Sequence, residues 1–203
     1  MIVTRIEELS RSKSKIYLDE SFAFVLYKGE LRLYGIREQE ELQEDSYRQI
    51  MEELLPKRAA LRCMNLLKSR AYTEHQLREK LAQGMYPQAC VDFALDYVKS
   101  YHYVDDERYA RDYIENQQDK KSRRIIEMDL MRKGISKEMI QEAFVRQEEL
   151  GNGPDEMALA RQWMDRKHFD PAKADFKEKQ KMYAFLYRRG IGAEIIMKLL
   201  SDD

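Results

Sequence analysis

Glycine and proline are scarce in this chain, which has 8 Gly and 4 Pro in 203 residues. Disordered chains are rich in these residues and poor in apolar ones, whereas the hydrophobic class here reaches 43%, so the composition favours a folded, strongly helical protein. Only two cysteines are present, Cys63 and Cys90, both among apolar neighbours. They predict small buried hydrophobic residues rather than a disulfide framework or a redox site.

Long hydrophobic runs are also absent, and no stretch approaches the roughly 18 apolar residues that a membrane span needs. Residues 1–6 lack the basic region and apolar stretch of a secretory signal, so we expect a cytoplasmic protein with no membrane partner. The net charge is -1, but residues 37–56 carry two basic and seven acidic side chains, and residues 57–134 sixteen basic and twelve acidic. The middle of the chain is therefore locally positive, which permits contact with a polyanion without requiring one.

Catalytic and metal-binding motifs are lacking as well. The three histidines, His75, His102 and His168, have no neighbours at metal-ligand spacing, so no zinc site is predicted. The acidic run 105–107 suits the positive end of a helix dipole better than an acid-base cluster. No phosphate-binding glycine loop, nucleophile elbow or zinc-protease motif is present. We therefore expect no catalytic residue, no cofactor and no metal.

What the sequence does contain is an internal repeat. Ala60, Ala110 and Ala160 lie 50 residues apart, and each opens a run that ends in two bulky residues. A glycine follows each alanine after 24, 24 and 30 residues, so six residues are inserted in the last unit. The matched positions are Gly84, Gly134 and Gly190, then Met85, Ile135 and Ile191 directly after them, and Cys90, Ile140 and Ile196 six positions after them. Such periodicity is typical of stacked helical units.

Each repeat is predicted to contain three helices. Thr73 with Gln76 matches a capping box, Asp105 and Ser136 are N-cap candidates, and Gly84 is expected to supply a left-handed helix end. In the third repeat Asp170 is expected to cap a second helix that the insertion lengthens. The expected helices are 57–70, 74–83 and 87–101, then 106–117, 121–133 and 137–150, then 155–167, 171–189 and 193–201.

Residues 1–36 show the alternation of strands, with Ile2–Glu8, 15–18, 22–27 and 31–34 as an antiparallel meander. A helix from about Glu38 to Leu55 is expected to cover it, with its acids outward. The predicted fold is mainly α: tandem three-helix repeats forming an elongated curved array, with a small β-strand-rich N-terminal extension. The predicted domains are 1–55 (meander plus acidic helix), 57–104 (repeat one), 105–150 (repeat two) and 154–203 (repeat three).

Residues 103–114, continuing to 130–135, resemble the RecX family of regulators of the RecA recombinase. The residues that carry this resemblance are Asp105, Asp106, Arg108, Tyr109, Ala110, Lys133, Gly134 and Ile135. The first repeat resembles the family's first unit over 60–67 and 72–81, with Thr73 where serine is common. The resemblance spans about 57–203, and it is weakest in the third repeat.

The resemblance implies a non-enzymatic protein that binds within the groove of the RecA filament on single-stranded DNA. Such a protein limits filament extension and lowers RecA ATP hydrolysis and strand exchange. Its expected partners are the RecA filament and, directly, single-stranded DNA. An array with distinct end units needs no symmetric partner, so we expect a monomer. Two alternatives remain open: a helical-repeat scaffold that joins two proteins, and a single-stranded nucleic-acid-binding protein that acts by competition.

Basic residues are the candidate partner-binding or DNA-binding residues. The densest run, 120–124, suits either a binding surface or a merely solvated helix face. Arg188 and Arg189 lie among aromatic residues that suit either base stacking or core packing, and they are expected to form a second basic face at the other end of the array. The full candidate set is Arg108, Arg111, Lys120, Lys121, Arg123, Arg124, Arg132, Lys133, Arg188 and Arg189.

Overall fold

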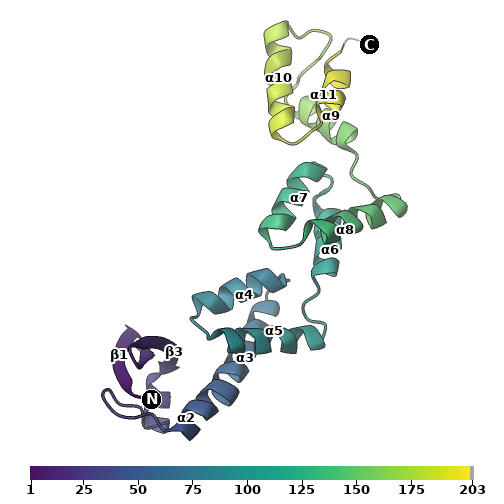
Figure 1. Cartoon of the computed structure of the whole chain (residues 1–203). Helices are drawn as coiled ribbons and strands as arrows, with labels where there is room; N and C mark the ends of the chain where they lie inside the picture. The colour runs from purple at the N-terminus through teal and green to yellow at the C-terminus, as the bar shows by residue number, and fades with distance from the viewer. Residues whose placement is uncertain (202–203) are drawn as a thin grey trace. The chain divides into compact units, whose positions relative to one another are not determined.

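The computed structural model describes residues 1–201 and divides the chain into two compact units, with the division between Asp105 and Asp106 (Figure 1). The N-terminal unit contains a small antiparallel sheet and the first three-helix repeat, and the C-terminal unit contains the second and third repeats. The predicted fold class, mainly helical with tandem three-helix repeats and a β-rich N-terminal extension, is confirmed.

The sheet consists of β1 (Val3–Ser10), β2 (Lys13–Leu18) and β3 (Ser21–Tyr27), paired antiparallel in that order. The prediction of a fourth strand at 31–34 is wrong, because these residues lie in or directly after helix α1 (Lys28–Leu33). The Glu30 carboxylate accepts the Tyr27 backbone N–H at 2.7 Å and so caps this helix. Leu31 packs against the core, whereas Leu33 is 74% exposed, a pattern with helical rather than alternating spacing.

One long helical segment follows, made of α2 (Glu44–Gln49), a π-helical turn η1 (Ile50–Leu54) and α3 (Leu55–Leu67). The prediction of separate helices at 38–55 and 57–70 is therefore wrong. Residues 38–43 are not helical, and Glu41 instead pairs with Ile2 in an isolated β-bridge. Pro56 does not break the helix, because the wider π turn directly before it accommodates a residue without an N–H.

The other helices follow the predicted order. They are α4 (Glu74–Gln83) and α5 (Gln88–Ser100) in repeat one, α6 (Asp106–Gln117), α7 (Arg123–Arg132) and α8 (Lys137–Glu149) in repeat two, and α9 (Glu156–Arg166), α10 (Phe176–Arg188) and α11 (Ala193–Leu200) in repeat three. The capping box of Thr73 with Gln76 and the Ser136 cap are confirmed.

Two predicted helix starts are wrong. Helix α7 begins after a Ser122 cap rather than at 121, and α10 begins after an Asp175 cap rather than at 171. Asp170 accepts the Ala172 N–H at 3.1 Å and forms a turn instead of a helix cap. Helix α10 has 13 residues against 10 in α7, so the insertion lengthens the helix as well as the connection before it.

The left-handed residue that ends α4 is Met85, with φ of 58°, and not Gly84 as predicted, whose φ is -78°. Met85 thus corresponds to Gly134 and Gly190, which have φ of 84° and 85°. In all three repeats the next N–H closes the same helix-ending hydrogen bond: Tyr86 to Leu81 O, Ile135 to Leu130 O and Ile191 to Leu186 O, at 3.3, 3.2 and 3.2 Å. The sequence alignment of the first repeat is therefore one residue out of register.

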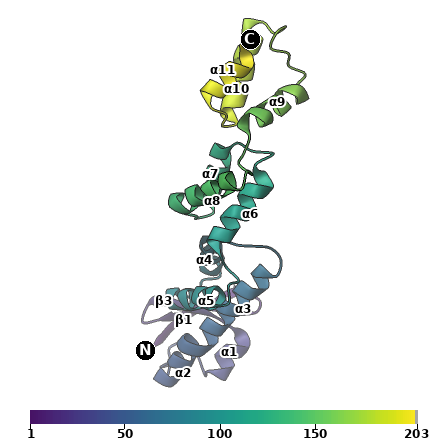
Figure 2. The same cartoon turned by 90° about the vertical axis from the view of Figure 1, so that its right-hand side faces the viewer.

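Each repeat buries an equivalent apolar stripe. The aligned alanines at 60, 110 and 160 are all buried on the first helix of their repeat. The two views show α5 lying beside α3, and the sheet and repeat one share one core (Figures 1 and 2). Cys63 and Cys90 are buried and not bonded to each other, and burial raises the pKa of the Cys63 thiol to about 11. No helix within residues 1–201 is long and apolar enough to cross a membrane.

Candidate partner-binding surface

Two stacked tyrosines on α6, which we call the tyrosine platform, lie at the centre of the basic residues of repeat two. Tyr109 and Tyr113 are one helical turn apart, and their rings stack with centroids 6.3 Å apart and planes 10° apart. The Lys133 ammonium lies 5.9 and 5.4 Å from the two ring centroids, and that of Lys121 lies 5.5 Å from the Tyr113 ring. Both contacts are within the range of cation–π attraction.

Asp129 on α7 anchors the tyrosine platform. Lys121 donates to its carboxylate at 2.7 Å and to the Tyr113 hydroxyl at 3.1 Å, and that hydroxyl donates to Asp129 at 3.0 Å. The hydrogen bond to Asp129 raises the pKa of Lys121. Partial burial raises the pKa of Asp129, but its hydrogen bonds to Lys121 and Tyr113 outweigh this and lower it. Lys121 therefore serves first as an internal cation, and Lys133 is the cation that lies over both rings.

The basic run 120–124 does not form one continuous face. Ser122 is buried and caps α7. Arg123 bonds to Glu127 at 3.0 Å and to Glu148 at 2.6 Å, and its guanidinium lies 4.5 Å from the Phe144 ring centroid, so it joins α7 to α8. Lys120 and Arg124 remain exposed on either side of the cap.

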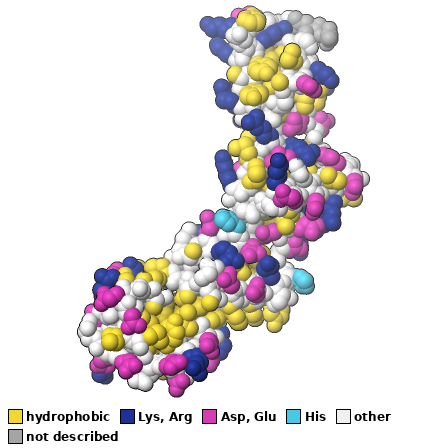
Figure 3. Space-filling view, in the orientation of Figure 1, with side chains coloured by type: hydrophobic (Ala, Val, Ile, Leu, Met, Phe, Trp, Pro, Cys, Tyr) yellow, Lys and Arg dark blue, Asp and Glu magenta, His cyan; other side chains and the backbone are white. Residues whose placement is uncertain are grey.

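Aromatic and cationic side chains also lie together at the C-terminal end of α10 in repeat three. Tyr183 and Tyr187 stack at 6.1 Å with an interplanar angle of 11°, which repeats the geometry of the tyrosine platform. The Arg189 guanidinium lies 4.8 Å from the buried Trp163 ring and 4.9 Å from Phe185. On the face drawn in Figure 3, basic side chains border exposed hydrophobic surface over this repeat. The aromatic residues thus divide between packing and surface, since Trp163 is buried and Tyr187 is 49% exposed.

The second and third repeats are joined at Ser122, next to Arg188 and Arg189, for which a second basic face stays a prediction. The Ser122 hydroxyl donates to the Arg189 carbonyl oxygen at 2.7 Å, and Arg124 lies 5.9 Å from the Tyr187 ring. A Cβ added to Gly190 would collide with the Ser122 Oγ. The end of α10 therefore lies directly beside the start of α7.

A partly buried carboxylate completes this junction. Glu156 at the start of α9 accepts the Arg123 backbone N–H at 3.1 Å. Burial raises the pKa of Glu156, although hydrogen bonds from the Arg123 and Gly192 backbone act in the opposite direction. The two repeats are thus connected by two hydrogen bonds, each between a side chain of one repeat and a backbone group of the other.

Comparison with known proteins identifies the repeats. Models of the first, second and third three-helix domains of RecX match residues 59–97, 105–143 and 154–200. A regulatory protein RecX from Caldanaerobacter subterraneus subsp. tengcongensis is 30% identical over 203 residues, which cover 99% of each chain. The chain belongs to the RecX family.

Other relatives agree with this assignment. The regulatory protein RecX from Clostridium botulinum strain Alaska E43 is 25% identical and aligns with 98% of this chain and 95% of its own length. A solved structure of regulatory protein RecX superposes over 100% of this chain and 99% of its own with a TM-score of 0.61 at 23% identity. RecX from Lactobacillus salivarius reaches 0.58 at 17% identity over 72% of this chain and 96% of its own. These two structures share the fold with this member of the RecX family.

The remaining candidates of this RecX family member lie apart from the junction contacts. Arg108 is exposed on α6 and lies 3.8 Å from Asp112, Arg111 is half-buried, and Arg188 is exposed at the end of α10. Arg132 is exposed and lies 3.9 Å from Asp129, at the edge of the platform network. No group of three or more His, Cys, Asp or Glu side chains within residues 1–201 could hold a metal ion.

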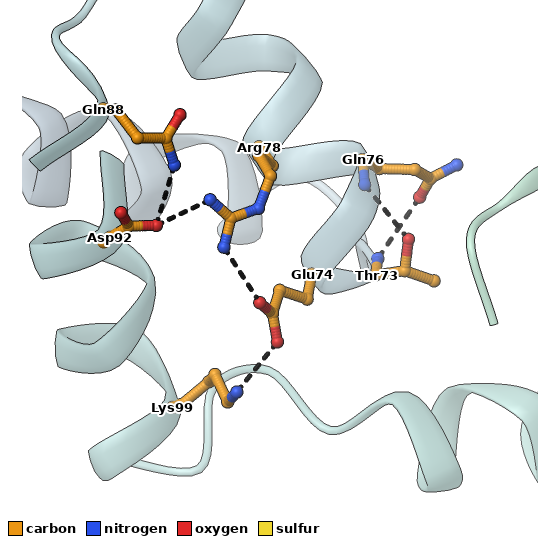
Figure 4. A network of polar contacts seen from close by, with 7 residues as sticks. All are labelled: Thr73, Glu74, Gln76, Arg78, Gln88, Asp92 and Lys99. Atoms are coloured by element: carbon orange, nitrogen blue, oxygen red, sulfur yellow. Dashed lines mark hydrogen bonds and ion pairs between the residues drawn. The ribbon is translucent and has the colours of Figure 1, made fainter. Parts of the chain in front are cut away.

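In repeat one, the polar contacts are structural (Figure 4). Arg78 bonds to Asp92 at 2.6 Å and to Glu74 at 3.2 Å, and Lys99 bonds to Glu74 at 2.8 Å. The Arg78 hydrogen bond lowers the pKa of Asp92, and the Lys99 hydrogen bond, against the effect of burial, lowers that of Glu74. These charges join α4 to α5.

Sequence reasoning missed the residues that position the basic side chains in this RecX family member: Ser122, Asp129 and Glu156. A signal existed for Ser122, since a serine just before a helical pattern indicates an N-cap. None existed for Glu156, because its hydrogen-bond donors lie 33 and 36 positions away in sequence.

Proposed function

We propose that the protein is a non-enzymatic, cytoplasmic regulator that binds the RecA filament on single-stranded DNA, limits filament extension and lowers RecA ATPase and strand exchange. Its membership of the RecX family over the full chain supports this proposal. The observation that carries the mechanism is the joint between repeats two and three, where Ser122 and Glu156 bond to backbone groups of the neighbouring repeat.

A rigid pair of repeats can resist the movements of a filament to which it is bound. Flexibly linked repeats would follow the filament as its subunits move, whereas repeats held together by the hydrogen bonds of Ser122 and Glu156 would keep their contact points closer to a constant separation. We propose that this pair spans neighbouring RecA subunits and hinders the changes that accompany ATP turnover. The contacting side chains would be the exposed Lys120, Arg124 and Arg132 and the half-buried Lys133, with Arg108, Arg111 and Arg188 at the margins. Lys121, Arg123 and Arg189 would hold this surface in place.

The test is single-stranded-DNA-dependent ATP hydrolysis by RecA from the same organism, with this protein added before or after filament assembly. We expect a fall in ATPase at amounts well below the RecA concentration. Lys120→Glu with Arg124→Glu should weaken inhibition at least tenfold, because two exposed cations become anions while both hydrogen bonds of Ser122 are kept. Lys57→Glu with Lys137→Glu, which changes the charge equally at exposed positions, is the matched control.

Competition for single-stranded DNA is the second candidate function, which the stacked tyrosines beside lysines favour. A competitor must be present in amounts comparable with the free strand, whereas a filament-bound regulator acts at far lower amounts. Inhibition that scales with the DNA concentration would support competition. No effect at equimolar protein, with folding confirmed by circular dichroism, would contradict both and favour a protein scaffold.

A further inference from the structure

A pocket of about 370 Å³ lies in the N-terminal unit between the sheet, α3 and the turn from α4 to α5. No carboxylate lines the pocket. Four cationic side chains line it, namely Lys13, Arg58, Arg62 and Lys80. In Figure 1 the turn between α4 and α5 faces the side of the sheet that carries β3. The volume falls within the range of small-molecule sites, roughly 300 to 1,000 Å³. Size and charge together suit an anionic ligand.

Arg58 is fixed in position within the pocket. Its Nη1 donates to both Glu30 carboxylate oxygens, at 3.2 and 2.9 Å, and its Nη2 donates to the Val25 carbonyl at 2.8 Å. Both side chains of this pair are only 18% exposed. The buried Nε of Arg58 has no hydrogen-bond partner among the described residues. Such an arrangement keeps the guanidinium rigid and leaves one donor unused.

The other three cations lack compensating charges. Within residues 1–201, Lys13, Arg62 and Lys80 form no ion pair, and Lys80 has only a 3.5 Å contact with Gln83. Cations that share a partly enclosed space repel one another, and a bound anion removes this repulsion.

Aromatic walls narrow the choice of anion. The Arg58 guanidinium lies 5.1 Å from the Tyr27 ring and 5.9 Å from the Tyr86 ring, and Lys13 lies 5.1 Å from Tyr27. Burial raises the pKa of Tyr86, so its phenol stays neutral and can donate. An inorganic anion would use the cations but not the rings. A nucleotide uses both, because its phosphate pairs with cations and its base packs on an aromatic face.

We propose that this pocket binds a nucleotide, with the phosphate held by Lys13, Arg62 and Lys80 and the base packed on Tyr27. A free nucleotide and a nucleotide within a single strand present the same chemistry, and the experiment separates them. The inference goes beyond the regulator function, because it concerns a different unit of the chain and is tested without RecA.

The test is isothermal titration of the full chain at low salt with thymidine 5′-monophosphate, pyrophosphate and thymidine. We expect thymidine monophosphate to bind, thymidine not to bind, and Arg62→Gln with Lys80→Gln to weaken binding at least tenfold. Tyr27→Leu should weaken thymidine monophosphate binding and leave pyrophosphate unchanged. The exposed pair Lys57→Gln with Lys137→Gln is the charge-matched control. Arg58 is not substituted, because its loss would leave the Glu30 carboxylate without its ion-pair partner. Unchanged thermal unfolding midpoints verify that each variant is folded.

Two oligomers complete the experiment. If pentathymidylate binds more tightly than the mononucleotide, the natural ligand is a nucleotide within a single strand. If it binds equally or more weakly, the natural ligand is a free nucleotide. Either outcome supports the site. Binding that is absent at millimolar nucleotide, or that persists in Arg62→Gln with Lys80→Gln, overturns the proposal. Pentaglutamate that binds as tightly as pentathymidylate also overturns it, since the pocket would then recognise an acidic protein segment.

Discussion

Replacing Ser122 by alanine should uncouple the second and third repeats. The Ser122 hydroxyl has two roles: it accepts the Ile125 N–H as the cap of α7, and it donates to the Arg189 carbonyl at 2.7 Å. Losing an N-cap costs about 1 kcal/mol, and leaving the partly buried Arg189 carbonyl without its donor costs roughly 1 to 3 kcal/mol. We therefore expect Ser122→Ala to lower the free energy of unfolding of the C-terminal unit by about 2 to 4 kcal/mol.

Ser136→Ala is the matched control, because Ser136 caps α8 with the same geometry, accepts the Met139 N–H at 3.2 Å and is exposed. It should cost only the cap, about 1 kcal/mol. The difference between the two variants isolates the bond between the repeats.

Urea unfolding followed by Trp163 fluorescence measures both variants, since this is the single tryptophan and it is buried beside Arg189. Equal losses of stability in the two variants, at unchanged urea dependence, would refute the reasoning that Ser122 connects the repeats.

Three further predictions use the same fluorescence assay. Gly190→Ala should lower the free energy of unfolding by at least about 2 kcal/mol, because φ at this position is 85° and the new Cβ would collide with Ser122. Gly192→Ala is the control and should cost far less, because open space surrounds this glycine. Equal losses in the two variants would contradict the close approach of Gly190 to Ser122. Glu156→Gln should become more stable relative to wild type as pH rises above 4.5. Burial raises the pKa of Glu156 in the folded state, so wild type loses stability when this carboxyl ionises, and glutamine does not ionise. A difference in stability that is constant with pH would contradict this prediction. Asp129→Asn should lower the free energy of unfolding by up to about 1 kcal/mol at pH 7, and this loss should vanish as pH falls below 3.8. The pKa of Asp129 is lowered in the folded state, so its carboxylate stabilises the fold only while it is ionised. A loss of stability that persists at low pH would indicate a packing effect instead.

Local sequence signals were sufficient at several positions where the determining contacts are local. The capping box at Thr73, the Ser136 cap and the buried alanines follow from spacings of a few residues, and the structure has them as predicted. The errors occur where a distant or neighbouring side chain competes with a local preference. Gly84 is the residue type expected at a left-handed helix end, but Met85 takes that conformation instead. Gly84 lies close to the Tyr86 ring, since a Cβ added at Gly84 would be 2.9 Å from it.

The basic candidates show the same division. Their charge and density were evident from the sequence, but their roles were not, because a salt bridge depends on which acid the fold brings near. Arg123 and Lys121 are adjacent to exposed cations in sequence, and yet one is held by Glu148 and the other by Asp129. Which residues of the set contact a partner stays a prediction.

The sequence by itself determined the three-helix repeats, the β-rich N-terminal part and the family, because period, caps and apolar spacing are properties of neighbouring residues along the chain. Only the tertiary structure decided which charges are internal and which are exposed, how Ser122 meets Arg189, and that four cations converge on one pocket. The physical reason is that these contacts join residues tens of positions apart, and the free energy of each depends on burial and distance that no local pattern encodes.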